Sequence, residues 1–113
     1  MKLNGLFDLS GKVAVVTGGT GYLGKSICEG LAEAGANVYL TSRNKNKAIK
    51  IKNNFSENIR NNISIETLDI LSTTSIKKSF NRIKNNSKKI DILVNNAVQS
   101  YSGNYEKMLE KEW

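Results

Sequence analysis

The sequence of 113 residues contains no histidine, no proline and a single cysteine, Cys28. One cysteine cannot form an internal disulfide, and without histidine no metal cluster can be assembled around it. Cys28 is expected to be a small packing residue rather than a reactive thiol. No apolar run approaches the roughly 18 residues of a spanning helix, and residues 1–9 lack the apolar core of a secretory signal. We therefore expect a soluble, cytoplasmic protein without a membrane partner.

Acidic residues are scarce relative to basic ones, with 10 Asp and Glu against 17 Lys and Arg, which gives a net charge of +7. Such an excess permits nucleic-acid binding, because clustered cations neutralise phosphates. The lysines, however, are spread over residues 45–52 and 77–89 and are interleaved with asparagine rather than with aromatic residues. This pattern favours solvated helix faces, so we expect no nucleic-acid partner.

Residues 12–24, KVAVVTGGTGYLG, contain the strongest local pattern. The apolar run Val13 to Val16 predicts a strand buried on both faces of a parallel sheet. Gly19, Gly21 and Gly24 then match the G-x-G-x-x-G spacing between a strand and a helix. Without Cβ atoms the backbone can take positive φ and approach a pyrophosphate closely, and the helix N-terminus attracts phosphate. The segment therefore predicts a dinucleotide site; the alternative is a tight turn that binds nothing.

Strand and helix patterns alternate along the rest of the chain, after a short lead-in over residues 4–11. We expect helices over residues 23–34, 45–60 and 72–83, strands over 37–41, 63–68 and 91–94, a loop over 99–104 and a helix over 105–113. Helices between successive strands imply right-handed crossovers and a parallel sheet. The expected fold is α/β: a Rossmann-type, doubly wound parallel sheet, β-α-β-α-β-α-β, with strand order 3-2-1-4, in one domain over residues 1–113.

Four local features together resemble the short-chain dehydrogenase/reductase family. They are DLSGK at 8–12, TGGTGYLG at 17–24, Asp69-Ile70 after the third expected strand and Asn95-Asn96-Ala97 after the fourth. The resemblance covers the whole chain. It implies that Asp69 contacts the adenine of a cofactor, and that the Asn-Asn-Ala turn supports the central strand and lies along the cofactor. The alternative for Asp69 is a cap in the helix region.

The expected cofactor site combines the glycine turn, the residues after the second strand and the residues that the resemblance implies. Its members are Thr17, Gly18, Gly19, Thr20, Gly21, Tyr22, Leu23, Gly24, Ser42, Arg43, Asn44, Asp69, Ile70, Asn95, Asn96 and Ala97. No catalytic residue and no metal ligand is assigned.

The choice between NAD and NADP depends on the end of the second strand. A NAD site normally has Asp or Glu there, about 20 residues after the glycine turn, whereas this chain has TSRN at 41–44. No carboxylate is present to repel a 2′-phosphate, and Arg43 offers a planar, charged fork that matches it. Ser42 adds a hydroxyl, and Lys45 or Lys47 adds charge. We predict NADP in preference to NAD; the alternative is that Arg43 is a solvated loop residue.

The chain departs from the family's usual motifs in two places. The usual Thr-Gly-x-x-x-Gly-x-Gly is here Thr-Gly-x-x-Gly-x-x-Gly, which is closer to the branch that acts on nucleotide sugars. The Asn-Asn-Ala turn is typical of the shorter branch, although Val98 replaces its usual final glycine. The subfamily stays open, and a sugar derivative is one candidate substrate.

The family's catalytic Tyr-x-x-x-Lys pair does not occur in these residues, since neither Tyr101 nor Tyr105 has Lys four positions later. The resemblance therefore implies the cofactor-binding half of an NAD(P)-dependent oxidoreductase, truncated before the catalytic half and inactive alone. Such an enzyme transfers hydride between the nicotinamide and a small carbonyl or alcohol substrate, and the full-length form is expected to be a homo-oligomer. The alternative is a non-catalytic dinucleotide-binding module or a truncated gene product.

Overall fold

The computed structural model describes residues 3–97, and the loop and helix expected after residue 98 lie outside that range. In chain order the elements are α1 (Leu3–Leu6), β1 (Val13–Val16), α2 (Tyr22–Glu33), β2 (Asn37–Ser42), α3 (Lys45–Asn54), α4 (Glu57–Arg60), β3 (Ile63–Thr67), α5 (Thr73–Ser87) and β4 (Ile92–Val94).

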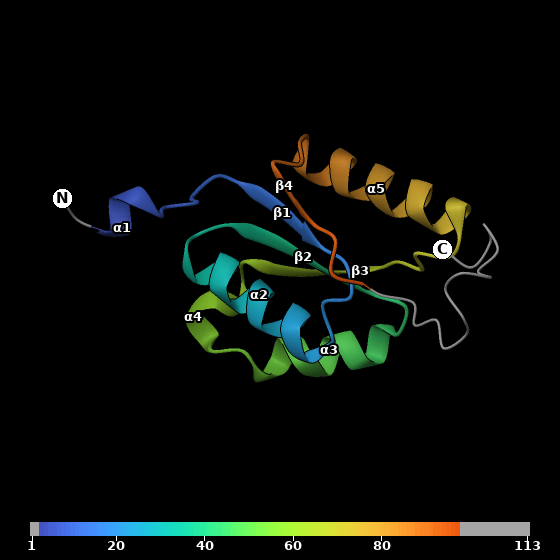
Figure 1. Cartoon of the computed structure of the whole chain (residues 1–113), viewed down its shortest axis with the longest axis horizontal. Helices are drawn as coiled ribbons and strands as arrows, with labels where there is room; N and C mark the ends of the chain where they lie inside the picture. The colour runs from blue at the N-terminus through green and yellow to red at the C-terminus, as the bar shows by residue number, and fades with distance from the viewer. Residues whose placement is uncertain (1–2, 98–113) are drawn as a thin grey trace, which may run out of the picture.

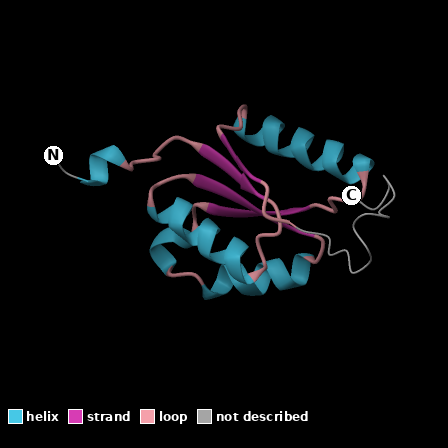
Figure 2. Cartoon of the chain, viewed as in Figure 1, coloured by secondary structure: helices cyan, strands magenta, loops and turns pink. Residues whose placement is uncertain are grey.

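The four strands form one parallel sheet in the order β3-β2-β1-β4. Helices α2, α3 and α4 cover one face, and α5 covers the other (Figures 1 and 2). The predicted doubly wound α/β fold and its strand order are therefore confirmed. All four strands point the same way, so the loops that leave their carboxyl ends gather at one edge of the sheet, where such folds bind their ligands.

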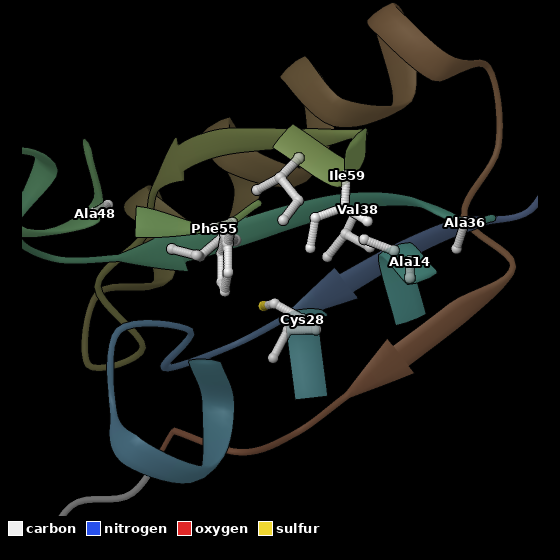
Figure 3. Close-up of a cluster of buried hydrophobic side chains, with 11 residues drawn as sticks. Ala14, Cys28, Ala36, Val38, Ala48, Phe55 and Ile59 are labelled. Atoms are coloured by element: carbon white, nitrogen blue, oxygen red, sulfur yellow. The ribbon is translucent and has the colours of Figure 1, made fainter. Parts of the chain in front are cut away.

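The core is built outward from β1, whose four residues are all buried. Alternate side chains of β1 enter different clusters: Ala14 and Val16 face the three-helix side, and Val13 and Val15 face α5. The cluster on the three-helix side is the larger and is drawn in Figure 3. Full burial of a valine stabilises the fold by roughly 1.5–3 kcal/mol, so an all-apolar strand is stabilised by a place between two other strands.

Cys28 belongs to the larger cluster and is fully buried on α2 (Figure 3). Burial raises the pKa of its thiol to about 12, because the thiolate would lose its hydration. The thiol is therefore protonated near neutral pH and packs as a small apolar group.

The single helix expected over residues 45–60 was wrong, because the structure divides it into α3 and α4. Phe55 takes an extended conformation, with φ −71° and ψ 154°, and its side chain is buried in the larger cluster. The Arg60 guanidinium donates to the Phe55 carbonyl at 2.9 Å and to the Asn53 carbonyl at 3.3 Å. These bonds satisfy acceptors that the end of α3 leaves free, so the chain can turn and bury Phe55. The lead-in also contains one short helix, α1, that the sequence pattern did not predict.

Candidate functional site

A cleft of about 710 Å³ opens at the carboxyl ends of the four strands. Its lining residues come from the loop after each strand and from the first turns of α2 and α3. They are Gly18, Thr20, Gly21, Tyr22, Leu23, Ser42, Arg43, Asn44, Lys47, Leu68, Asp69, Ile70, Leu71, Asn96 and Ala97. Residues far apart in the sequence thus share one site because parallel strands end at the same edge.

Two glycines of the turn after β1 are required by contacts within the protein. Gly18 has φ +65°, and a Cβ there would lie 2.9 Å from the Ala97 Cα. A Cβ on Gly24 would lie 2.2 Å from the Gly18 carbonyl oxygen and 2.7 Å from the Asn96 side-chain nitrogen. These positions let the turn, α2 and the loop after β4 pack closely together.

Gly21 differs from its neighbours because the fold leaves room for a side chain there. Its φ is −71°, a value open to any residue, and a Cβ would meet only the Gly18 carbonyl oxygen, at 3.5 Å. The expected positive φ therefore belongs to Gly18 and not to Gly21. Gly21 lines the cleft, so its missing side chain leaves the backbone accessible to whatever occupies the cleft.

The N-terminus of α2 has no side-chain cap, because its N-cap residue is Gly21. The helices that follow β2 and β3 are capped: Asn44 accepts from the Lys47 N–H in α3, and Ser72 accepts from the Ser75 N–H in α5. The unpaired N–H groups and the helix dipole give the first turn of α2 partial positive charge at the cleft. This end of the cleft favours an anion such as a diphosphate.

Thr17 ties the turn after β1 to the loop after β4. Its hydroxyl donates to the Val94 carbonyl at 3.3 Å and accepts from the Asn96 and Ala97 N–H groups at 3.0 Å each. The Asn96 side chain donates in turn to the Gly18 carbonyl at 3.1 Å. Thr17 is buried, so its hydroxyl shapes the cleft from below the surface rather than from its wall.

Two basic side chains, Arg43 and Lys47, line the cleft beyond the end of β2, and both are exposed. Neither forms an ion pair with any carboxylate of residues 3–97. Beside them Ser42 is buried; its hydroxyl accepts from the Asn44 N–H at 3.0 Å and lies 3.4 Å from the Thr20 hydroxyl. The two cations give this part of the cleft a net positive charge.

Asp69 supplies the carboxylate of the cleft lining. Its Oδ1 accepts from the Leu71 N–H at 3.0 Å, and its own N–H donates to the Ser75 hydroxyl at 2.9 Å. Ser72 is the N-cap of α5, so Asp69 shapes the turn before the helix and is not the cap itself. Leu68, Ile70 and Leu71 make the surroundings of this carboxylate apolar.

Most of the expected cofactor residues line the cleft, but four do not: Thr17, Gly19, Gly24 and Asn95. Gly19 packs below the turn, where a Cβ would lie 2.6 Å from the Leu40 side chain. Sequence reasoning missed Leu68 and Leu71, and it treated Lys47 only as a neighbouring charge. Leu68 and Leu71 directly flank Asp69-Ile70 in the sequence, and this adjacency was the signal that could have identified them.

Within residues 3–97, no group of three or more Cys, Asp and Glu side chains is placed to hold a metal ion. In the same part of the chain, every helix is too short or too polar to cross a bilayer.

The fold agrees with what comparison with known proteins shows. The family model described as short chain dehydrogenase matches residues 12–113, so the chain belongs to the short-chain dehydrogenase family.

The individual relatives share 25–40% sequence identity with this chain and are longer than it. The chain is 40% identical over 93 residues to the 3-oxoacyl-acyl-carrier-protein reductase of Aquifex aeolicus, an alignment of 79% of this chain and 36% of that protein. A short-chain type dehydrogenase/reductase from Mycobacterium marinum superposes with a TM-score of 0.80 at 26% identity, over 99% of this chain and 45% of that one. A gluconate 5-dehydrogenase from Burkholderia cenocepacia, solved with NADP and tartrate, gives 0.78 at 25% identity, over 99% and 44%. The chain thus spans less than half the length of each of these proteins.

Proposed function

We propose that the cleft binds a nicotinamide dinucleotide, with NADP preferred to NAD. The observation that carries this proposal is the joining, in one cleft, of the uncapped N-terminus of α2 with Arg43 and Lys47. The first feature suits a diphosphate and the second suits an additional phosphate. The gluconate 5-dehydrogenase that superposes with a TM-score of 0.78 was solved with NADP, which supports the same ligand class.

The lining residues fit the parts of NADP in the order of the strands. The glycine turn after β1 would hold the diphosphate, and Arg43, with Ser42 and Lys47, would hold the 2′-phosphate after β2. Asp69, Ile70 and the flanking leucines after β3 would receive the adenine. Asn96 and Ala97, after β4, would lie along the remainder of the cofactor. No carboxylate follows β2, where a NAD site would place one to bind the ribose hydroxyls.

The activity that follows from this ligand is oxidoreduction. A bound nicotinamide supplies hydride transfer to or from a carbonyl or alcohol carbon, and a sugar derivative is among the candidate substrates. The residues of this chain bind the dinucleotide and orient it, while Thr17 and Asn96 hold the loops after β1 and β4 in register. In this proposal residues 1–113 provide the cofactor-binding half of the site.

Substitution of Arg43 tests the choice of cofactor. In Arg43→Ala we expect NADP affinity to fall by about 10- to 100-fold, because a charge-assisted contact contributes on the order of 1.5–3 kcal/mol. NAD affinity should change little. Isothermal titration calorimetry of the parent and the variant with both dinucleotides gives the four dissociation constants that are compared.

Arg82→Ala is the matched control, because Arg82 is an exposed arginine on α5 that pairs with Glu66 and does not line the cleft. It should leave both affinities unchanged. Equal affinities for NADP and NAD in the parent, or an equal loss of both in Arg43→Ala, would refute the preference for NADP.

Dinucleotide binding without catalysis is the second candidate function, because the 113 residues contain no Tyr-x-x-x-Lys. Both candidates require NADP binding and differ in turnover. Because residues 1–113 would supply only the cofactor-binding half, a reading frame that continues past Trp113 into a Tyr-x-x-x-Lys, in a protein that oxidises NADPH with small ketones or aldehydes, would support the enzyme; a stop codon after Trp113 together with tight NADP binding would support the module.

A further inference from the structure

Tyr22 is an aromatic residue that the fold does not bury. It is the first residue of α2 and is 89% exposed, more than any other large apolar residue described in the structure. No residue in the range 3–97 forms a hydrogen bond with its hydroxyl. An aromatic side chain gains from being covered, so such exposure at a cleft points to a partner that residues 3–97 do not supply.

The position of Tyr22 directs its ring towards the cleft. In a helix the Cα–Cβ bond tilts towards the N-terminus, and the N-terminus of α2 opens onto the cleft. Tyr22 accordingly lines the cleft together with Gly21 and Leu23. It also stands where the usual Thr-Gly-x-x-x-Gly-x-Gly pattern has glycine, so the ring is an addition to that pattern and the backbone does not require it.

The order of the strands indicates which part of a dinucleotide the ring meets. Tyr22 follows β1, which lies between β2 and β4. Arg43, after β2, and the apolar residues after β3 lie on one side of it, and Ala97, after β4, lies on the other. The central place at the uncapped helix N-terminus is that of the diphosphate.

We propose that the Tyr22 ring covers the diphosphate of the bound dinucleotide and slows its release, an inference that rests on the proposed cofactor function. The ring would shield the phosphates and the N–H groups of the first turn from water, which strengthens their electrostatic attraction. Gly21, without a side chain, gives the diphosphate access to the backbone, and Tyr22 then closes over it.

Two variants of the full chain separate the ring from the hydroxyl. In Tyr22→Ala we expect the dissociation rate of NADP, measured by stopped-flow displacement, to rise about tenfold, with a matching loss of affinity. In Tyr22→Phe both quantities should stay within about twofold of the parent, because the ring is retained. Adenosine 2′-monophosphate lacks both phosphates of the diphosphate and the nicotinamide half, so its affinity should be the same in all three proteins.

Phe7→Ala is the control, because Phe7 is 64% exposed and does not line the cleft. It should leave NADP release unchanged. Unchanged release in Tyr22→Ala would overturn the inference, and so would an equal acceleration in Tyr22→Phe, which would assign the contact to the hydroxyl. Failure of the parent to bind NADP would instead refute the proposed cofactor function.

Discussion

The two ends of the parallel sheet use charged side chains in opposite ways. At the carboxyl end, Arg43 and Lys47 line a cleft without a carboxylate partner among residues 3–97. At the amino end, the Asp91 carboxylate accepts from the Val13 N–H at 2.8 Å and lies 3.0 Å from the Lys89 ammonium. Asp91 and Lys89 at the amino end thus pair with each other, whereas Arg43 and Lys47 at the carboxyl end have no carboxylate partner among residues 3–97.

The glycines near the carboxyl end of the sheet also differ from one another in their surroundings. Gly18 and Gly24 are needed by the protein itself, because added Cβ atoms would collide with backbone atoms. At Gly21 the protein leaves space. Stability and binding should therefore respond to different glycines of the same turn.

The largest effect is expected from Gly24→Ala. Its Cβ would meet the Gly18 carbonyl and the Asn96 side chain, and backbone cannot move aside as a flexible side chain can. We expect the free energy of unfolding in urea to fall by about 3 kcal/mol. Gly30→Ala is the matched control on the same helix, because no atom lies within 4 Å of its Cβ position; it should gain about 0.8 kcal/mol from helix propensity. Equal effects of the two variants would contradict the close packing at Gly24.

Gly21→Val should weaken NADP binding strongly while it changes the stability of the fold little. Thermal and urea unfolding should change by no more than about 1 kcal/mol, because the N-cap residue makes no side-chain bond and its surroundings are open. NADP affinity should fall by at least about 100-fold, or about 2.7 kcal/mol, because the valine would occupy the space of the diphosphate. Unchanged affinity in calorimetry would remove the glycine turn from the binding site.

The smallest effect is expected at the amino end, from Asp91→Asn. The hydrogen bond from the Val13 N–H, and then that from Lys89, lower the pKa of Asp91 below its usual 3.8. A lowered pKa stabilises the folded state above the unfolded value, and this stabilisation is lost as pH falls through the folded value. Asp91→Asn should therefore be slightly less stable than the parent at pH 7, with a difference that disappears below pH 3.8. Urea unfolding across this range measures it.

NADP binding provides the internal control for Asp91→Asn, because Asp91 lies at the opposite end of the sheet from the cleft. Its affinity should equal that of the parent. At a pH where the Asp91 carboxyl of the parent is protonated, it is as uncharged as the amide of the variant. A difference in the free energy of unfolding that persists there would show that the charge of Asp91 is not the cause.

Much of the fold could be predicted because its signals are local. The apolar run of β1, the glycine spacing and the alternation of strands and helices each lie within a few adjacent residues, and together they led to the observed strand order. The division between α3 and α4 could not be predicted in this way. It depends on the burial of Phe55 and on bonds from Arg60 to carbonyls that α3 leaves free.

Part of the cleft lining could also be predicted from the sequence. Motif spacing selected Gly18, Gly21 and Arg43, which the structure brings into one cleft. Spacing could not separate Gly21 from Gly24, because the same residue type leaves open space at the cleft at one position and permits close backbone packing at the other. The glycine and Asn-Asn-Ala motifs did not include Leu71, which follows Ile70 in the chain and lines the cleft because the end of β3 lies at the same sheet edge as the ends of β1 and β2.

By itself, the sequence determined the fold class of this protein, since a parallel sheet follows from helices placed between apolar strands; glycines at a helix start predict an anion site. Tertiary structure decided which polar groups are satisfied. Lys89 and Arg43 are both cations in loops, yet one lies beside Asp91 and the other has no carboxylate partner in the described range. Lys89 is only two residues from Asp91, but the Asp91 carboxylate also accepts from the Val13 N–H, 78 residues earlier in the chain, and only the packed sheet brings these two groups together.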